Sequence, residues 1–224
     1  MWSAWRSGPA SLYLGVGVVL LRDADGREVL VNHASTWPVA RVLRQLSEAR
    51  SAAGQASPAR GRRLEVSLSA AHSPAVWCDI PAGVRTWQEK QALRAHQVGS
   101  VMQMDAQDVQ LAGDRDGGAL CSGMAQSLFV ALAQWASDVG FKLASVRPLW
   151  SQATQSGHAA TRAAIVVREP GAVTVVQAQA ARSVIGTDAA LPMAADVAGF
   201  HFSVESGPEG PGAPAAWRNH WELS

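Results

Sequence analysis

The feature that most constrains the fold is the block of residues 118–148, where a helical pattern stands between two extended apolar runs. The first run covers residues 119–124 and leads into a helix. One face of that helix carries the apolar side chains Leu128, Phe129, Leu132, Trp135, Ala136 and Val139. Gly140 follows the last periodic position and is expected to end the helix, and residues 141–146 then form a second strand. The block predicts a β-α-β unit within an α/β fold.

Composition narrows the class of protein without indicating an activity. A chain of 224 residues with 48% hydrophobic and 17% charged residues is ordinary for a soluble globular protein with one or two cores. Its net charge of +1 makes a nucleic-acid partner unexpected. The apolar run of residues 12–21 contains two glycines and is too short to cross a bilayer. We therefore expect a cytoplasmic protein with no signal peptide and no membrane span.

The first third of the chain is predicted to contain a hairpin and a helix. Residues 12–21 are interpreted as one buried strand, and residues 27–32 as its hairpin partner across a turn at 23–26. Pro38 is suited to the first turn of a helix, because its missing N–H needs no partner there. The apolar stripe predicted for this helix consists of Val39, Val42, Leu43, Leu46 and Ala49. Residues 51–63 are predicted to be a loop.

Further strands and helices follow this loop. Residues 64–69 alternate as a half-buried strand, and residues 75–80 form a second strand after a turn. Thr86 and Glu89 have the spacing of a capping box, at the start of a helix that reaches about Gln97. The other predicted elements are a short strand at 109–112, a polar connector at 151–160, and a hairpin of residues 163–168 and 172–177 turned at Glu169-Pro170-Gly171.

No catalytic or metal-binding motif in the sequence is complete. Gly15-Val16-Gly17 lacks the third glycine and the following helix of a phosphate loop, so we interpret its glycines as relieving crowding in a twisted strand. Ser122-Gly123 is not part of a G-x-S-x-G nucleophile turn. Neither the histidines nor a group of aspartates has the spacing of a metal site, so no metal is expected. These residues are His33, His72, His96, His158, His201 and His220, and Asp105, Asp108, Asp114 and Asp116.

The two cysteines, Cys78 and Cys121, form no CxxC pair and no metal-ligand spacing. A pair of buried thiols in a reducing compartment is the simplest interpretation, against metal ligands or a disulfide. A thiol nucleophile at either position would need a base that the fold brings to it. A small cysteine-dependent hydrolase therefore stays open as an alternative function.

The order of predicted elements resembles the actin-like module of pilus and type II secretion assembly proteins, the PilM family and the cytoplasmic part of GspL. Three short stretches carry the resemblance. They are Leu12-Tyr13-Leu14-Gly15-Val16-Gly17, the pairing of Val66-Ser67-Leu68 with Cys78-Asp79-Ile80-Pro81 before the Glu89 helix, and the turn Asp138-Val139-Gly140-Phe141 with the strand ending Val146-Arg147-Pro148. The resemblance implies a reduced actin-like, RNase H-like mixed sheet with flanking helices.

The resemblance also implies a domain organisation. Residues 12–205 would form the actin-like α/β domain, with a sub-boundary near 151–160. Residues 1–11 would be an N-terminal segment, and residues 206–224 a Gly/Pro-rich C-terminal tail.

The departures from the family pattern concern its nucleotide site. Members that bind ATP have an acidic residue in the first hairpin and an acid-Gly pair in the second phosphate hairpin. Here no carboxylate precedes Asp23 in the first strand, and Pro170 removes an N–H donor from the second hairpin. The resemblance therefore implies a pseudo-ATPase with no cofactor and no catalytic residue. The alternative is a nucleotide-binding actin-like ATPase, whose ligand would contact Gly15, Gly17, Glu169 and Gly171.

We expect a non-catalytic scaffold or interaction protein in a cell-envelope assembly such as a type IV pilus or type II secretion platform, cytoplasmic or peripheral at the inner membrane. Its partner would be a protein, such as a bitopic inner-membrane assembly protein or a second copy of the chain. Tryptophan is favoured at the centre of interfaces, and several tryptophans lie outside the periodic faces. The predicted partner-binding residues are Trp2, Trp5, Trp217 and Trp221, with Trp150 also outside those faces. Packing onto the protein's own body would cover them equally well.

Overall fold

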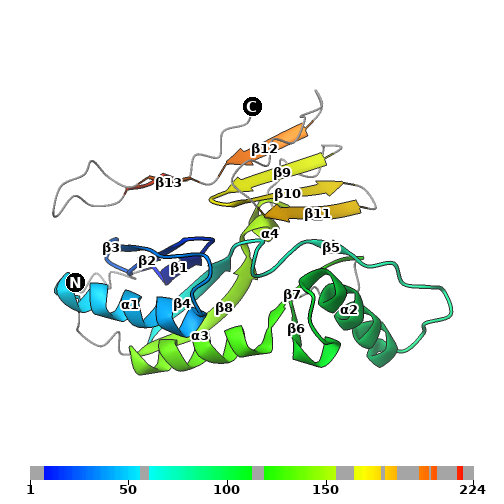
Figure 1. Ribbon diagram of the computed structural model, residues 1–224, viewed down its shortest axis with the longest axis horizontal. Coiled ribbons are helices and arrows are strands. Elements are labelled where there is room, and N and C mark those ends of the chain that lie inside the picture. Colours follow the sequence, from blue (N-terminus) through cyan, green and yellow to red (C-terminus); the bar gives the residue numbers. More distant parts are fainter. Residues whose placement is uncertain are drawn as a thin grey trace, which may run out of the picture.

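The computed structural model describes residues 8–55, 61–112, 119–154, 164–177, 180–185, 197–201, 203–205 and 216–218. Its largest sheet has five strands in the order β3-β2-β1-β4-β8 (Figure 1). These strands are β1 (Ala10–Leu14), β2 (Val18–Arg22), β3 (Glu28–Asn32), β4 (Arg62–Leu68) and β8 (Phe141–Pro148). The first three pair antiparallel, whereas β4 runs parallel to both β1 and β8. The predicted mixed α/β fold class is confirmed.

Two helices, α1 (Val39–Ala52) and α3 (Gln126–Asp138), pack on one face of this sheet (Figure 1). Alternate residues of a strand face opposite sides, so Leu12 and Leu14 meet the helices while Tyr13 points to the other face. The indole Nε1 of Trp135 in α3 donates to the Ser47 hydroxyl in α1 at 2.9 Å. The apolar stripes predicted for both helices form this core.

A second sheet has the order β11-β10-β9-β12 and lies beyond the face of the first sheet that the helices leave open (Figure 1). Its strands are β9 (Ala164–Glu169), β10 (Ala172–Gln177), β11 (Ala180–Ile185) and β12 (Val197–His201). Strands β9 and β10 form the hairpin predicted around Glu169-Pro170-Gly171. The short helix α4 (Leu149–Thr154) follows β8, and strands β13 (Ser203–Glu205) and β14 (Ala216–Arg218) pair near the end of the chain.

A small sheet of order β5-β7-β6 packs against helix α2 (Trp87–Met102). Its strands are β5 (Val76–Trp77), β6 (Val109–Ala112) and β7 (Leu120–Ala125), and the 3₁₀ helix η1 (Ala106–Asp108) precedes β6. The predicted capping box is confirmed: the backbone N–H of Glu89 donates to the Thr86 hydroxyl at 3.2 Å, and the Glu89 carboxylate accepts from the Thr86 backbone at 3.0 Å. Helix α2 continues to Met102, beyond the predicted end near Gln97.

Two strand predictions in the first half of the chain are wrong. Residues 12–21 form two strands rather than one, because the chain turns at Gly15-Val16-Gly17. Gly17 has a φ of +74°, a conformation that glycine adopts with little strain, so its role is to make the turn. Residues 75–80 form only the two-residue strand β5, which pairs with β7 instead of returning along β4.

The β-α-β prediction is wrong in its pairing, although all three elements exist. Strand β7 lies in the small sheet and β8 in the large one, so helix α3 joins two sheets rather than two strands of one sheet. The polar connector predicted at 151–160 begins inside helix α4, and residues 155–160 lie outside the described residues. The irregular stretch predicted at 207–214 also lies outside them.

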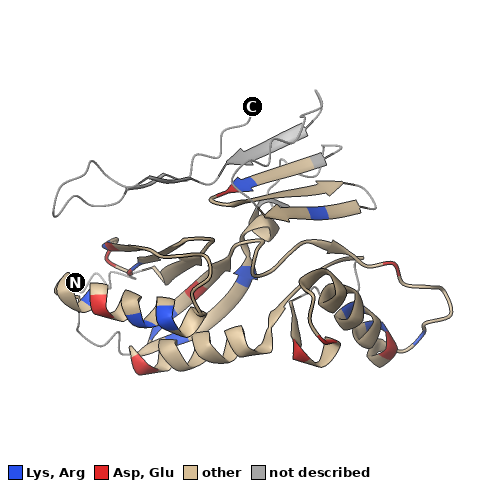
Figure 2. Cartoon of the chain, in the orientation of Figure 1, with Lys and Arg blue, Asp and Glu red and all other residues tan. Residues whose placement is uncertain are grey.

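Charge is unevenly distributed over the helices. Figure 2 shows charged positions along α1 and α2, whereas α3 has a single charged residue, Asp138, at its end. Within the part of the chain that the structure describes, no helix has both the length and the hydropathy needed to cross a bilayer.

Candidate functional site at the junction of two hairpins

Two hairpin turns from distant parts of the sequence meet between the large sheet and the β9–β12 sheet. The first turn, Gly15-Val16-Gly17, joins β1 to β2 and is closed by the Gly15 N–H, which donates to the Val18 carbonyl at 2.9 Å. The second turn, Pro170-Gly171, joins β9 to β10, and Gly171 has a φ of +71°. Both turns therefore contain a glycine, Gly17 or Gly171, with a positive φ that other residues rarely adopt.

The two turns touch directly. A Cβ atom placed on Gly171 would lie only 2.8 Å from the Cβ of Val16, so the Val16 side chain occupies the space in front of the second turn. A similar crowding holds just after β1, where a Cβ on Gly15 would lie 2.5 Å from the Tyr13 ring. We call this region the hairpin junction, formed by Tyr13, Gly15-Val16-Gly17, Ser69, Ala70, His72 and Glu169-Pro170-Gly171.

A buried hydrogen-bond network crosses the hairpin junction. The Tyr13 hydroxyl donates to Glu169 Oε2 at 3.1 Å, and the Ala70 backbone N–H donates to Glu169 Oε1 at 2.6 Å. The hydroxyl of Ser69 hydrogen-bonds with both side chains. Tyr13 is fully buried and Glu169 is 7% exposed, so the network joins the two sheets out of contact with bulk water.

Burial controls the ionisation of this network. It raises the pKa of the Glu169 carboxyl to about 7, against the opposing effect of hydrogen bonds from Ala70, Tyr13 and Ser69. Burial also raises the pKa of the Tyr13 hydroxyl, and the nearby charge of Glu169 raises it further. Burial therefore favours the protonated form of the Glu169 carboxyl up to pH values well above its ordinary range.

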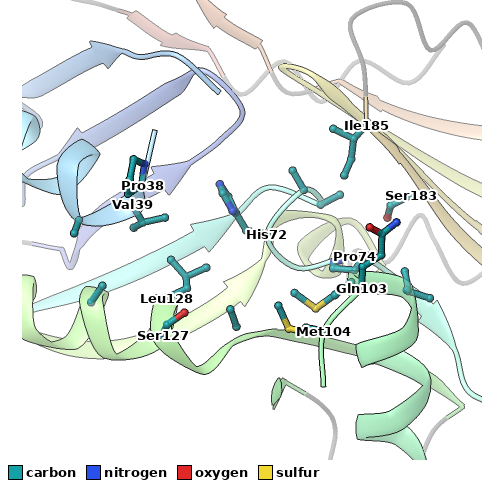
Figure 3. A pocket seen from close by; sticks show the side chains of 17 residues that line it. Pro38, Val39, His72, Pro74, Gln103, Met104, Ser127, Leu128, Ser183 and Ile185 are labelled. Carbon is teal, nitrogen blue, oxygen red and sulfur yellow. The ribbon is translucent and has the colours of Figure 1, made fainter. Parts of the chain in front are cut away.

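An open apolar cleft of about 710 Å³ lies beside the hairpin junction. His72 projects into it between Val39 at the start of α1, Leu128 in α3 and Ile185 in β11 (Figure 3). Burial lowers the pKa of His72, while a hydrogen bond to the Gly15 backbone raises it and the charge of His33 lowers it. The imidazole thus links the first turn to the wall of the cleft.

The structure brings together all four residues that the sequence assigned to a nucleotide, since Gly15, Gly17, Glu169 and Gly171 all belong to the hairpin junction. The acidic residues of the first hairpin, Asp23 and Asp25, do not lie at the hairpin junction. Asp23 Oδ1 accepts from the backbone N–H groups of Asp25 and Arg27, at 2.9 Å each, in the turn at the far end of β2. Asp25 forms an ion pair with Arg62 at 3.1 Å.

The other residues considered from the sequence lie outside the hairpin junction. Cys78 and Cys121 are both buried, and the Ser122 hydroxyl donates to the Pro74 carbonyl at 2.9 Å. Among the described residues no group of three metal-ligating side chains occurs, and Asp114 and Asp116 fall outside those residues. The interpretation of Trp150 as lying outside the core is wrong: it is 4% exposed, and its indole Nε1 donates to the Ser73 carbonyl at 2.9 Å.

The terminal tryptophans remain untested. Trp2, Trp5 and Trp221 lie outside the described residues. Trp217 is in β14, opposite Val204 of β13, but its side chain lies outside the described part of the chain. Their assignment as partner-binding residues therefore stays a prediction.

Sequence reasoning missed Tyr13, Ser69, Ala70 and His72 as members of the site. Tyr13 is the only tyrosine in the chain and stands two positions before Gly15, which is the signal that could have indicated it. Ser69, Ala70 and His72 follow β4 in a loop whose N–H and hydroxyl groups reach the site only after β4 pairs with β1. Their sequence pattern contains no such signal.

Comparison with known proteins gives matches in structure alone. No family model matches the chain, and no curated protein matches it in sequence. It is similar to the cytoplasmic domain of EpsL, an inner membrane component of the type II secretion system of Vibrio cholerae, with a TM-score of 0.50 and 14% identity over 86% of this chain and 81% of that one.

Two further solved structures are less similar. A protein from Bacteroides thetaiotaomicron with an actin-like ATPase fold and unknown function has a TM-score of 0.47 and 10% identity, over 83% of this chain and 73% of that one. A chain of the PilM-PilN type IV pilus biogenesis complex has a TM-score of 0.46 and 11% identity, over 79% and 61%. At these identities a likeness shows a shared fold alone, and the resemblance inferred from the sequence is confirmed at that level: the chain has a fold similar to that of the EpsL cytoplasmic domain.

Proposed function

We propose that this chain is a non-catalytic interaction protein in a cell-envelope assembly, such as a type II secretion or type IV pilus platform. The observation that carries the proposal is the closed hairpin junction, in which Val16 fills the space in front of Gly171. The fold likeness to the cytoplasmic domain of an inner-membrane secretion component suggests the setting. Such a protein would be cytoplasmic or peripheral at the inner membrane.

The chemistry of the junction favours a pseudo-ATPase. A phosphate needs free backbone N–H groups and a nearby cation, and an actin-like site needs a carboxylate to orient water. Pro170 has no N–H, and the carboxylate of Glu169 faces Tyr13 and Ala70 rather than an open site. Asp23 is engaged by its own turn at the opposite end of β2.

Two alternative functions make specific structural demands. Nucleotide binding is favoured by the convergence of Gly15, Gly17, Glu169 and Gly171 at one junction, and would require the two turns to separate. A cysteine-dependent hydrolase would require Cys78 or Cys121 to reach solvent, and they are 0% and 5% exposed. The cysteine alternative is therefore the weaker of the two.

Thermal unfolding with and without Mg-ATP separates scaffold from ATPase. A ligand present at a hundred times its dissociation constant adds about 2.7 kcal/mol to the free energy of unfolding. For a chain of this size that gain corresponds to an increase in Tm of roughly 5–10 °C. We expect no increase, and a reproducible one in this range would contradict the pseudo-ATPase proposal.

A partner contact through the chain ends is tested by substituting the tryptophans. In the Trp2→Ala/Trp5→Ala double variant, both substituted positions precede β1 in the sequence. Because β1 begins at Ala10, the five-stranded sheet should keep its strand pairing. We expect it to lose association with inner-membrane assembly proteins of its host at an unchanged Tm. A lower Tm with association retained would indicate instead that the two side chains pack on the protein's own body. Trp217→Ala and Trp221→Ala give the same test at the other end.

A further inference from the structure

The two cysteines of the chain lie side by side on neighbouring strands. Val76 of β5 is paired with Cys121 of β7, and the Cys78 N–H donates to the Ala119 carbonyl at 2.6 Å just beyond the end of β5. Residues two apart in a strand share a face, so Cys78 and Cys121 occupy diagonal positions on the same face of this pairing. Their thiols are hydrogen-bonded to each other.

The thiols are placed where one sulfur can act as a nucleophile and the other can resolve the product. Arg94 of α2, itself only 3% exposed, has a positive charge that lowers the pKa of both cysteines. The hydrogen bond from Cys78 is the largest influence on Cys121 and lowers its pKa, although burial opposes this. The same hydrogen bond raises the pKa of Cys78. The positive charge of Arg94 therefore favours ionisation of this pair of thiols.

The thiol cluster and the open cleft share a neighbour. The thiols belong to an apolar cluster with Val76 and Val98, and the half-buried Met102 packs against that cluster. Met102 also lines the open cleft of about 710 Å³. The flexible Met102 side chain thus borders both the cleft and the thiol cluster, and Cys121 retains 5% exposure while Cys78 has none.

We propose that Cys78 and Cys121 form a reversible oxidation site, which a small peroxide converts into an intramolecular disulfide. The Cys121 thiolate attacks one oxygen of hydrogen peroxide; an S–O bond forms, the O–O bond breaks, and the departing hydroxide takes a proton to become water. The Cys78 sulfur then attacks Sγ of the Cys121 sulfenic acid as its thiol gives up its proton; the S–S bond forms, the S–O bond breaks, and the departing hydroxide takes that proton to leave as a second water. Two thiols lose two electrons and two protons in total, and one peroxide becomes two waters.

The disulfide would join the end of β5 to β7. This part of the small sheet is hydrogen-bonded to the β9–β12 sheet. The Ala75 N–H, at the approach to β5, donates to the Ser183 hydroxyl of β11 at 3.1 Å. Close by, the Ser73 and Ser122 hydroxyls are hydrogen-bonded at 2.7 Å, and Ser73 also accepts from Trp150. Oxidation would therefore act on the small sheet where it meets the rest of the fold, and a dithiol reductant would reverse it.

The test uses the reduced full-length chain exposed to hydrogen peroxide, once folded and once unfolded in urea. After exposure, the free thiols are alkylated under denaturing conditions and counted by intact mass. We expect the folded chain to lose both alkylatable thiols, to show a linked peptide pair containing Cys78 and Cys121, and to recover both thiols with dithiothreitol. Formation of this disulfide should be at least tenfold faster in the folded chain than in the unfolded one, because the fold holds the two sulfurs together.

Single variants assign the roles of the two thiols. In Cys78→Ser, the sulfenic acid at Cys121 has no resolving thiol and should be trapped by dimedone, whereas Cys121→Ser should trap several-fold less at Cys78. The proposal is overturned if the folded wild-type chain keeps both thiols free under peroxide that oxidises the unfolded chain. It is equally overturned if the folded chain yields only intermolecular disulfides or sulfinic acids. These outcomes are read from the wild-type protein and do not depend on the variants folding.

Discussion

Replacing the buried carboxyl of Glu169 by an amide should change how the stability of the protein depends on pH. Burial raises the pKa of Glu169 to about 7 from the ordinary value of 4.5. A carboxyl with a raised pKa in the folded state binds its proton more tightly there, so the folded state loses relative stability as the pH rises. The loss begins near the unfolded-state pKa and is complete above the folded-state pKa.

The size of the effect follows from the difference between the two pKa values. A difference of one in pKa corresponds to about 1.4 kcal/mol, so the free energy of unfolding should fall by about 3 kcal/mol between about pH 4.5 and pH 8 through this group. Glu169→Gln has no charge to bury and keeps an oxygen for the Ala70 N–H. Its amide group can donate to the Tyr13 oxygen. The variant should therefore lack this fall and be more stable than the wild type at pH 8.

Urea unfolding of both proteins at several pH values between 4.5 and 8 measures the effect. Glu65→Gln is the matched control, because Glu65 is an exposed carboxylate in β4. His72 contributes in the opposite direction, since burial lowers its pKa and so reduces stability as the pH falls below the ordinary value of 6.5. Subtracting the Glu169→Gln profile from that of the wild type removes this contribution. Parallel profiles for the wild type and Glu169→Gln would refute the reasoning.

Three further perturbations have expected outcomes in denaturant unfolding. Gly171→Ala should destabilise the protein by about 1–3 kcal/mol more than Gly26→Ala, because both positions have positive φ but only the Cβ at 171 would meet Val16; equal losses would mean that the two turns do not touch in solution. Thr86→Ala should cost about 1 kcal/mol through loss of the capping box of α2, with no effect expected from the neighbouring exposed Arg85→Ala. Leu132→Ala should cost about 2–5 kcal/mol, because this α3 side chain is fully buried in the main core, and a loss below 1 kcal/mol would contradict that packing.

Local signals in the sequence were sufficient for elements whose contacts are close in the chain. The capping box at Thr86, the turn held by Asp23 and the apolar stripe of α1 each involve residues within a few positions of one another, and each is confirmed. The residue types and the spacings that allow these local contacts can be read directly from the sequence. The resemblance to the assembly-protein family likewise came from short local stretches and from the succession of elements, and the fold likeness to the EpsL cytoplasmic domain confirms it at the level of the fold.

Strand pairing and the candidate site depended on the tertiary structure. The apolar run before α3 has the same pattern whether it pairs with β8 or with β5, and only packing around α2 places it in the small sheet. The Tyr13–Glu169 hydrogen bond joins residues 156 positions apart, and the pKa of Glu169 follows from burial that neither residue shows in sequence. Alternation of apolar residues specifies that a strand is buried on one face but not which strand lies beside it. For that reason the sequence indicated the two glycine turns, while their contact through Val16 and Gly171 could be seen only in the folded chain.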